Sequence, residues 1–209
     1  MTNGMSRLGA VLALVLAPGL VRAEGPAFDC DKADGTVEKM ICTDTGLSAL
    51  DRKLDGVYEA ALARARDDVP RFLRTEQRGW IKGRDECWKA EGGGPVYLTA
   101  SWTAASVHDC VEGQYRLRIS ELQALMRLVP EKGPVFFACE GNPANGIVAT
   151  FFETDPPTAR IERGDRTVTA WLVPTGSGAK YEGQNVEFWN KGKDAMVTWN
   201  GDKMTCTTR

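Results

Sequence analysis

The chain has 209 residues, with 26 basic and 28 acidic side chains, one histidine and six cysteines. A net charge of −2 is unlike the basic surface that nucleic-acid binding requires, so no nucleic-acid partner is expected. One histidine and no closely spaced cysteine pair argue against the usual zinc sites, and neither a metal nor a cofactor is expected. The length suits two small domains.

Residues 1–23 have the features of a signal peptide. Arg7 precedes an apolar run from Leu8 to Val21, and the small residue Ala23 ends the segment. The run is too short to span a bilayer as a mature helix, and no second long apolar stretch follows. We therefore expect cleavage near Ala23, export to the periplasm and a mature chain without a stable membrane anchor.

All six cysteines lie beyond this segment. An even number of cysteines in an oxidising compartment favours disulfides. Several pairings are formally possible, and the order along the chain favours pairing consecutive cysteines, namely Cys30–Cys42, Cys87–Cys110 and Cys139–Cys206.

Residues 24–129 predict a helical domain. Apolar residues recur at three- and four-residue steps from Leu47 to Ala65, and Pro70 ends or offsets this helix. A second helix is expected to run to Cys87, and a third covers 106–128. Two disulfides would stabilise a helical unit whose core is small.

Several polar and aromatic residues of this half have two possible roles. Gln77 and Arg84 are read as members of a buried network or as functional residues. Asp51 is expected at the helix surface or as a cap. The large aromatic residues are expected in the core; these are Tyr58, Trp80 and Tyr115.

The pattern changes after a linker predicted at residues 130–134. Residues 135–209 contain eight short alternating runs separated by glycine, proline, asparagine and aspartate, which predicts an eight-stranded antiparallel barrel. A bridge between Cys139 in the first strand and Cys206 in the last would close it. The strands are expected at 135–140, 147–153, 158–163, 167–173, 179–181, 186–190, 195–199 and 204–207.

The C-terminal half also carries a recognisable set of motifs. These are Cys139, Ser177-Gly-Ala-Lys-Tyr181, Phe188-Trp189, Lys191-Gly192, Ala195 and Cys206. The set resembles the MliC family, inhibitors of c-type lysozyme from Gram-negative bacteria. The resemblance covers about residues 134–209 and implies a barrel fold, a lysozyme partner and no enzymatic activity.

The N-terminal half is similar to a second family. Its motifs are Cys30, Thr36-Val-Glu38, Cys42, Leu47-x-x-Leu50-Asp51, Tyr58 and Gln77-x-x-Trp80-x-x-x-Arg84-x-x-Cys87. They resemble the LprI family of disulfide-bonded envelope domains, some of which are described as lysozyme inhibitors. The role of this half is left open between a second inhibitory unit, another envelope partner and a spacer.

The MliC resemblance implies that Ser177 and Lys191 enter the lysozyme cleft. Lysozyme cleaves with one protonated and one ionised carboxyl group. An ammonium suits the ionised carboxylate, and a hydroxyl suits the other group because it both donates and accepts. Gly178 and Gly192 would allow close approach, and Tyr181 and Trp189 would shape the surface.

Two other readings compete with inhibition. A Ser–Lys hydrolase needs a neutral, desolvated lysine and an oxyanion hole, and no GxSxG or SxxK motif is present. An envelope module that binds glycan or peptidoglycan without inhibiting lysozyme is the alternative we retain. Ser177-Gly178 and Lys191-Gly192 are also compatible with simple turns.

Overall fold

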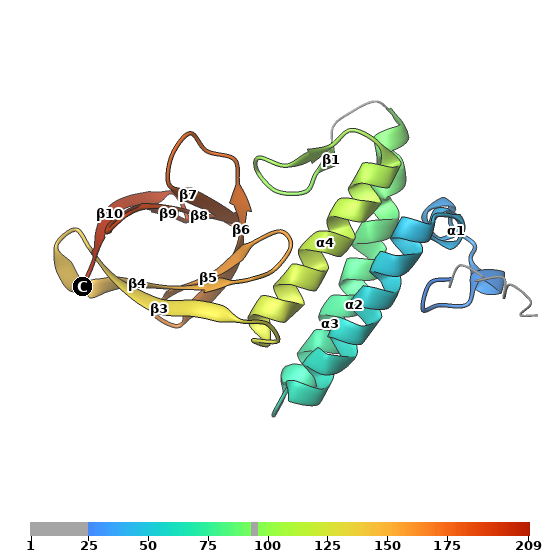
Figure 1. The fold of residues 1–209 in the computed structure, drawn as a ribbon, viewed down its shortest axis with the longest axis horizontal. Helices are drawn as coiled ribbons and strands as arrows, with labels where there is room; N and C mark the ends of the chain where they lie inside the picture. The colour runs from blue at the N-terminus through green and yellow to red at the C-terminus, as the bar shows by residue number, and fades with distance from the viewer. Residues whose placement is uncertain (1–24, 93–95) are drawn as a thin grey trace, which may run out of the picture.

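The computed structural model describes residues 25–92 and 96–209, and the predicted signal peptide at 1–23 lies outside them. Helices make up the first half and a closed barrel the second, which confirms the predicted fold class (Figure 1). Within the described residues, none of the helices combines the length and the apolar character that a membrane crossing needs.

The helical half has four α-helices and two short 3-10 turns, whose bounds are η1 Cys30–Lys32, α1 Thr36–Thr43, α2 Thr45–Arg64, α3 Val69–Asp85, η2 Glu86–Gly92 and α4 Val107–Leu125. Asp44 caps α2 by accepting the N–H of Leu47 at 2.8 Å. Ser106 caps α4 in the same way. Pro70 lies in the first turn of α3, where its missing N–H costs no helical bond. The third predicted helix, expected at 106–128, ends three residues earlier, at Leu125. The second, expected to run to Cys87, ends at Asp85, and the 3-10 turn η2 follows it.

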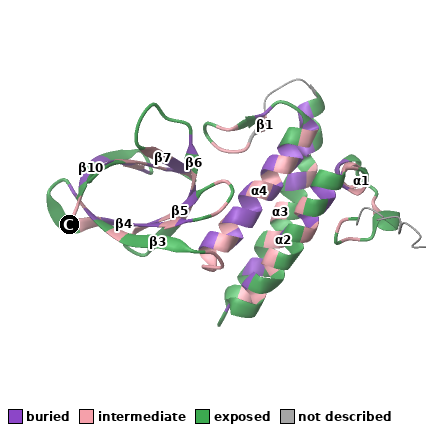
Figure 2. Ribbon diagram, in the orientation of Figure 1, coloured by how far each residue is buried: buried purple, intermediate pink, exposed green. Residues whose placement is uncertain are grey.

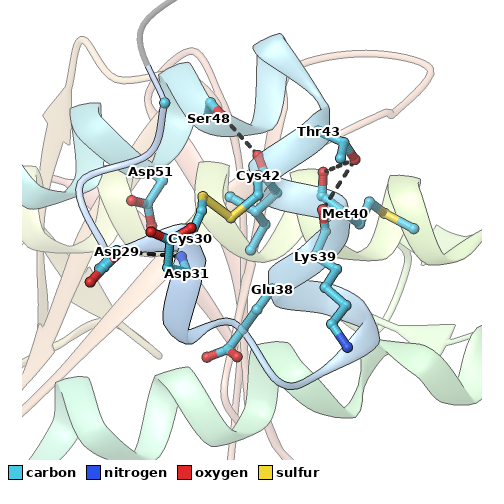
Figure 3. Close-up of a disulfide and its surroundings, with 12 residues drawn as sticks. Asp29, Cys30, Asp31, Glu38, Lys39, Met40, Cys42, Thr43, Ser48 and Asp51 are labelled. Atoms are coloured by element: carbon cyan, nitrogen blue, oxygen red, sulfur yellow. Dashed lines mark hydrogen bonds between the residues drawn. A yellow bond between two sulfur atoms is a disulfide. The ribbon is translucent and has the colours of Figure 1, made fainter.

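All three predicted disulfides are present. Cys30–Cys42 ties η1 to α1 beside the start of α2, as Figure 3 shows. Cys87–Cys110 joins η2 to α4, and both sulfurs are buried in the helical core. A short hairpin, which the sequence did not predict, lies between these elements; its strands are β1 Val96–Tyr97 and β2 Thr103–Ala104.

The barrel strands follow one another in antiparallel order and the last pairs with the first. Their bounds are β3 Glu131–Cys139, β4 Asn142–Phe152, β5 Thr158–Arg163, β6 Arg166–Val173, β7 Ala179–Gly183, β8 Val186–Lys191, β9 Asp194–Trp199 and β10 Asp202–Thr208. All eight predicted strands are thereby confirmed. Cys139 and Cys206 lie directly opposite each other on β3 and β10, so their disulfide closes the seam. Residues 131–134 of the expected linker belong to β3.

The barrel is filled by alternate side chains from every strand. Phe137 and Phe188 meet edge to face with ring centroids 5.4 Å apart. Small residues such as Ala159 and Ala170 face each other where the larger rings need space. The interior is a packed core and not a ligand cavity.

Helix α4 lies between the other helices and the barrel, and Figure 2 shows it as the most continuously buried helix. One side packs into the helical core through Val111, Tyr115 and Leu122. The other side packs against β5 and β6. The Trp171 indole N–H donates to the Ser120 hydroxyl at 2.9 Å across this contact.

Two polar contacts extend this interface. Arg116 of α4 forms an ion pair of 2.6 Å with Asp155, in the loop between β4 and β5. The Ser101 hydroxyl, from the β1–β2 hairpin, donates to the buried Glu182 carboxylate of β7 at 2.6 Å. The two halves therefore share a contact surface that runs along α4 and reaches β7.

Candidate functional site

Ser177 and Lys191 are brought together by the pairing of β7 with β8. Ser177 and Gly178 precede β7, and Lys191 ends β8, where Ala179 pairs with Asn190. The Lys191 ammonium lies 3.5 Å from the Ser177 hydroxyl. Both residues are exposed. A hydroxyl and an ammonium fourteen residues apart in sequence thus form one exposed pair at a barrel end.

Trp189 holds the serine in place. Its indole N–H donates to the Ser177 carbonyl at 2.7 Å, and the ring is half-buried. The Thr175 hydroxyl approaches the same carbonyl at 3.5 Å. The backbone at Ser177 is therefore anchored while the residue stays exposed. Trp189 acts here as a support for the loop.

Gly178 has a conformation and a setting that exclude other residues. Its φ is +70°, and a Cβ atom would lie 2.5 Å from the Asn190 carbonyl oxygen. Such a distance requires the backbone to move. Gly192 also has a positive φ, of +62°, but an added Cβ would meet no atom within 4 Å. Gly178 thus sets the approach of the two loops, and Gly192 shapes the turn after β8.

Tyr181 does not join the exposed pair. It is 8 % exposed, lies in the barrel core and contacts the Phe151 ring at a centroid distance of 5.5 Å. Burial raises the pKa of its phenol above the ordinary value. Phe188 lies directly opposite it on β8. The role predicted for Tyr181 in shaping the surface is therefore restricted to packing from beneath.

The charge of Lys191 is not neutralised by any carboxylate in the part of the chain that the structure describes. The acid nearest in sequence, Asp194, pairs with Lys191 across the turn, but its carboxylate accepts from the Thr207 hydroxyl at 3.0 Å. An exposed ammonium also keeps its hydration, whereas a lysine that acts as a base must lose it. The arrangement suits an ion-pair donor for another molecule better than a catalytic pair.

The polar residues of the LprI-like motif form a buried network in the helical half. The Tyr115 hydroxyl donates to Asp51 at 2.7 Å and accepts from Arg84 at 3.0 Å. Asp51 also accepts the Ala27 N–H at 2.7 Å. The expectation of a surface or capping role for Asp51 is wrong, because this carboxylate fastens the segment before α1 onto α2. Desolvation raises the pKa of Tyr115, since the phenolate form would be buried.

Gln77 and Arg84 take part in buried contacts, as one of the two predicted roles requires. Gln77 accepts from Arg118 at 3.0 Å, and the Arg84 guanidinium lies 5.6 Å from the Trp80 ring centroid. Both residues line a hollow of about 310 Å³ with Phe28. None of the predicted helical-core aromatics is brought near Ser177 by an observed contact.

Sequence reasoning did not find the interface residues Ser101, Arg116, Ser120 and Trp171. The available signal for this interface was Trp171, a tryptophan at a strand position that faces outward by alternation. Ala170 faces the barrel core, so its neighbour Trp171 must face away from it. An outward tryptophan needs a second surface to cover it.

Comparison with known proteins follows the same division. Residues 137–205 match the family model of MliC, "Membrane-bound lysozyme-inhibitor of c-type lysozyme". Residues 30–122 match that of LprI, "Lysozyme inhibitor LprI". Both halves of the chain resemble lysozyme inhibitors. The two resemblances predicted from the motifs are thereby confirmed.

Similarity to curated proteins extends across both halves. Proteins named "Lipoprotein LprI" from Mycobacterium bovis and Mycobacterium tuberculosis are 25 % identical over 185 residues. The alignment covers 88 % of this chain and 85 % of each relative. Regions similar to lysozyme-inhibitor families thus lie in both halves of the chain, and these relatives align across both.

Proposed function

We propose that this protein inhibits c-type lysozyme by inserting Ser177 and Lys191 into the cleft of the enzyme, and so protects peptidoglycan. The observation that carries the proposal is the exposed pair itself. Its ammonium lies 3.5 Å from the serine hydroxyl and has no carboxylate partner among the described residues. The match of this region to the MliC model supports it.

The chemistry of the cleft fits this pair. The ionised carboxylate of lysozyme would replace water around the Lys191 ammonium, and the protonated acid would bond the Ser177 hydroxyl. Removing an ammonium from water is favourable only when a charge and hydrogen bonds compensate it. Ser177 is already oriented by Trp189, so less conformational freedom is lost on binding.

The proposed place of action is the periplasm, after cleavage of residues 1–23. The names of the matched family and relatives, "Membrane-bound" and "Lipoprotein", support the cell envelope more broadly. The proposal of a soluble mature form is tested by fractionating cells and locating the protein in the soluble or the membrane fraction. N-terminal sequencing of the exported chain tests cleavage near Ala23.

Inhibition is tested by following the clearing of a bacterial suspension by c-type lysozyme. We expect the full mature chain to slow clearing, and Lys191→Ala to lose affinity by about 2–5 kcal/mol. Lys193→Ala is the matched control, because Lys193 is an exposed lysine two residues away in the same turn. Equal affinities of the two variants would contradict the proposal.

Two further measurements separate inhibition from the competing readings. Labelling by a serine-reactive acylating reagent would indicate a hydrolase, and we propose that none occurs. Retention on purified peptidoglycan in the absence of lysozyme would indicate the alternative, a glycan-binding module. We expect the mature chain to bind lysozyme whether or not peptidoglycan is present.

A further inference from the structure

The end of the barrel away from Ser177 and Lys191 carries two arginines that face each other. Successive hairpin turns of an up-and-down barrel alternate between its ends. The turns at 164–165, 184–185 and 200–201 therefore lie at one end, and the loops at 174–178 and 192–193 lie at the other. Arg163 and Arg166 flank the first of these turns and are directly opposite on β5 and β6.

Both arginine side chains are on the interior face of the barrel wall. Ile161 and Val168 pair across the same two strands and pack in the core. Side chains two residues further along a strand lie on the same face, so Arg163 and Arg166 occupy the last interior positions before the turn. They line one hollow of about 480 Å³ together with the buried Trp199.

Arg163 is half-buried and Arg166 is exposed, so water weakens the repulsion between the two charges without removing it. Like charges directly opposite each other on neighbouring strands destabilise a sheet. Arg163 donates to the Asn145 side-chain carbonyl at 3.1 Å, and in the described part of the chain no other hydrogen bond or ion pair engages either guanidinium. Asp202 lines the same hollow and Asp165 lies in the turn between the two arginines, and neither acid forms an ion pair with Arg163 or Arg166.

We propose that this barrel mouth binds a phosphate-bearing ligand between Arg163 and Arg166. A guanidinium group offers two parallel N–H donors that match phosphate oxygens, and phosphate supplies the negative charge that the two arginines lack. The volume of the hollow is in the range of small-molecule sites. The Asn200 amide and the Asp202 carboxylate also line the hollow, where they can bond hydroxyl groups beside the phosphate.

The site is independent of lysozyme inhibition because it uses the opposite end of the barrel. A neighbouring hollow of about 350 Å³ shares Arg166, Trp199 and Asn200, so the mouth accommodates more than a bare phosphate. The same chemistry has two sources, a soluble phosphate ester and the headgroup of an anionic lipid. A binding measurement with soluble phosphates and a flotation measurement with lipid vesicles distinguish the two sources.

Binding is measured on the full mature chain by calorimetry, at constant ionic strength, with inorganic phosphate, glycerol 3-phosphate and acetate. We expect both phosphates to bind and acetate to bind more weakly. Arg166→Gln and Arg163→Gln should each weaken phosphate binding by about tenfold or more. Arg160→Gln is the matched control, since it removes the same charge from the outer face of β5, where Arg160 pairs with Glu162 at 2.5 Å.

Flotation with phosphatidylcholine vesicles, with and without phosphatidic acid, distinguishes the sources. Binding to the acidic vesicles that Arg166→Gln abolishes assigns a lipid headgroup, and binding of glycerol 3-phosphate alone assigns a soluble ester. A wild-type chain that binds neither phosphate, or that binds acetate as tightly, overturns the proposal. Phosphate binding that Arg166→Gln leaves unchanged also overturns it.

Thermal unfolding supplies a second readout. In phosphate-free buffer, Arg166→Gln should unfold at the same or a higher temperature than the wild type, because it removes a repulsion. Phosphate should raise the unfolding temperature of the wild type and of Arg160→Gln only. A lower unfolding temperature of Arg166→Gln without phosphate would show that the pair serves the fold and would overturn the proposal. Lysozyme inhibition by Arg166→Gln should equal that of the wild type.

Discussion

The hydroxyl of Ser120 accepts the indole N–H of Trp171 at 2.9 Å while donating to the Leu117 carbonyl in its own helix at 2.9 Å. The serine is completely buried. One hydroxyl thus links α4 to the outer face of β6 through a partly buried hydrogen bond. This contact joins the helical half to the barrel.

The first prediction follows from this contact. Trp171→Phe removes the donor and should lower the free energy of unfolding by about 1 kcal/mol, since a buried acceptor loses its partner. Urea unfolding followed by circular dichroism measures the change. Trp88→Phe is the control, because Trp88 is 51 % exposed and its replacement should cost less than about 0.5 kcal/mol. Equal effects would mean that the hydrogen bond does not contribute.

A second prediction concerns Gly178. Gly178→Ala places a Cβ atom against the Asn190 carbonyl, so the loop that carries Ser177 must shift. We expect a marked loss of lysozyme inhibition in the clearing assay, together with lower stability. Gly141→Ala is matched in conformation, with a φ of +66° and no atom within 4 Å of the added Cβ. It should cost only the backbone strain, about 1 kcal/mol, and leave inhibition intact.

The Asp51–Tyr115–Arg84 network gives a third prediction. Tyr115→Phe deletes the hydroxyl that both charged groups use, and should destabilise the protein by about 2–3 kcal/mol. Tyr58→Phe serves as the control, because Tyr58 is only half-buried. Chemical denaturation of both variants measures the difference. A cost for Tyr115→Phe no larger than that for Tyr58→Phe would show that the network is not needed for stability.

A fourth prediction concerns pH. The hydrogen bond from the Leu47 N–H is the main cause that holds the pKa of Asp44 below its ordinary value of 3.8. His108, whose ring nitrogen lies 3.4 Å from the carboxylate, lowers this pKa further. The folded state therefore favours the ionised carboxylate. Its contribution to stability is complete above pH 3.8 and is lost as the pH falls through the lowered pKa.

Asp44→Asn keeps a capping oxygen and removes the titration. We expect the stability difference between wild type and this variant to shrink as the pH is lowered from 6 towards the region below pH 3.8. Thermal unfolding at a series of pH values measures it. A difference that stays constant over this range would contradict the assignment.

The sequence allowed the barrel to be predicted because each strand repeats an alternation that its own turns delimit. Tyr181 shows a limit of the prediction. Strand alternation, with Phe188 opposite, places its ring inside the barrel, whereas the motif alone suggested a surface role. The β1–β2 hairpin escaped prediction because its strands have two residues each, too few to show a period. The proximity of Ser177 and Lys191 follows from hairpin pairing and could therefore be predicted from the sequence.

The second buried side of α4 could not be predicted from the sequence. Gly113, Ser120 and Ala124 look like the solvent-facing side of an ordinary helix, but they are small because other parts of the chain come close. An added Cβ at Gly113 would lie 2.2 Å from the Leu98 side chain in the hairpin. Contacts between segments that far apart leave no periodic signal in the local sequence.

Helix α4 belongs to both halves at once, and this limits how the protein can change. A deletion that separates the barrel would uncover Trp171, and a deletion that separates the helices would uncover the side of α4 that holds Ser120. Each half therefore covers a surface of the other that would otherwise be exposed to water. Substitutions along this helix are therefore constrained by both halves.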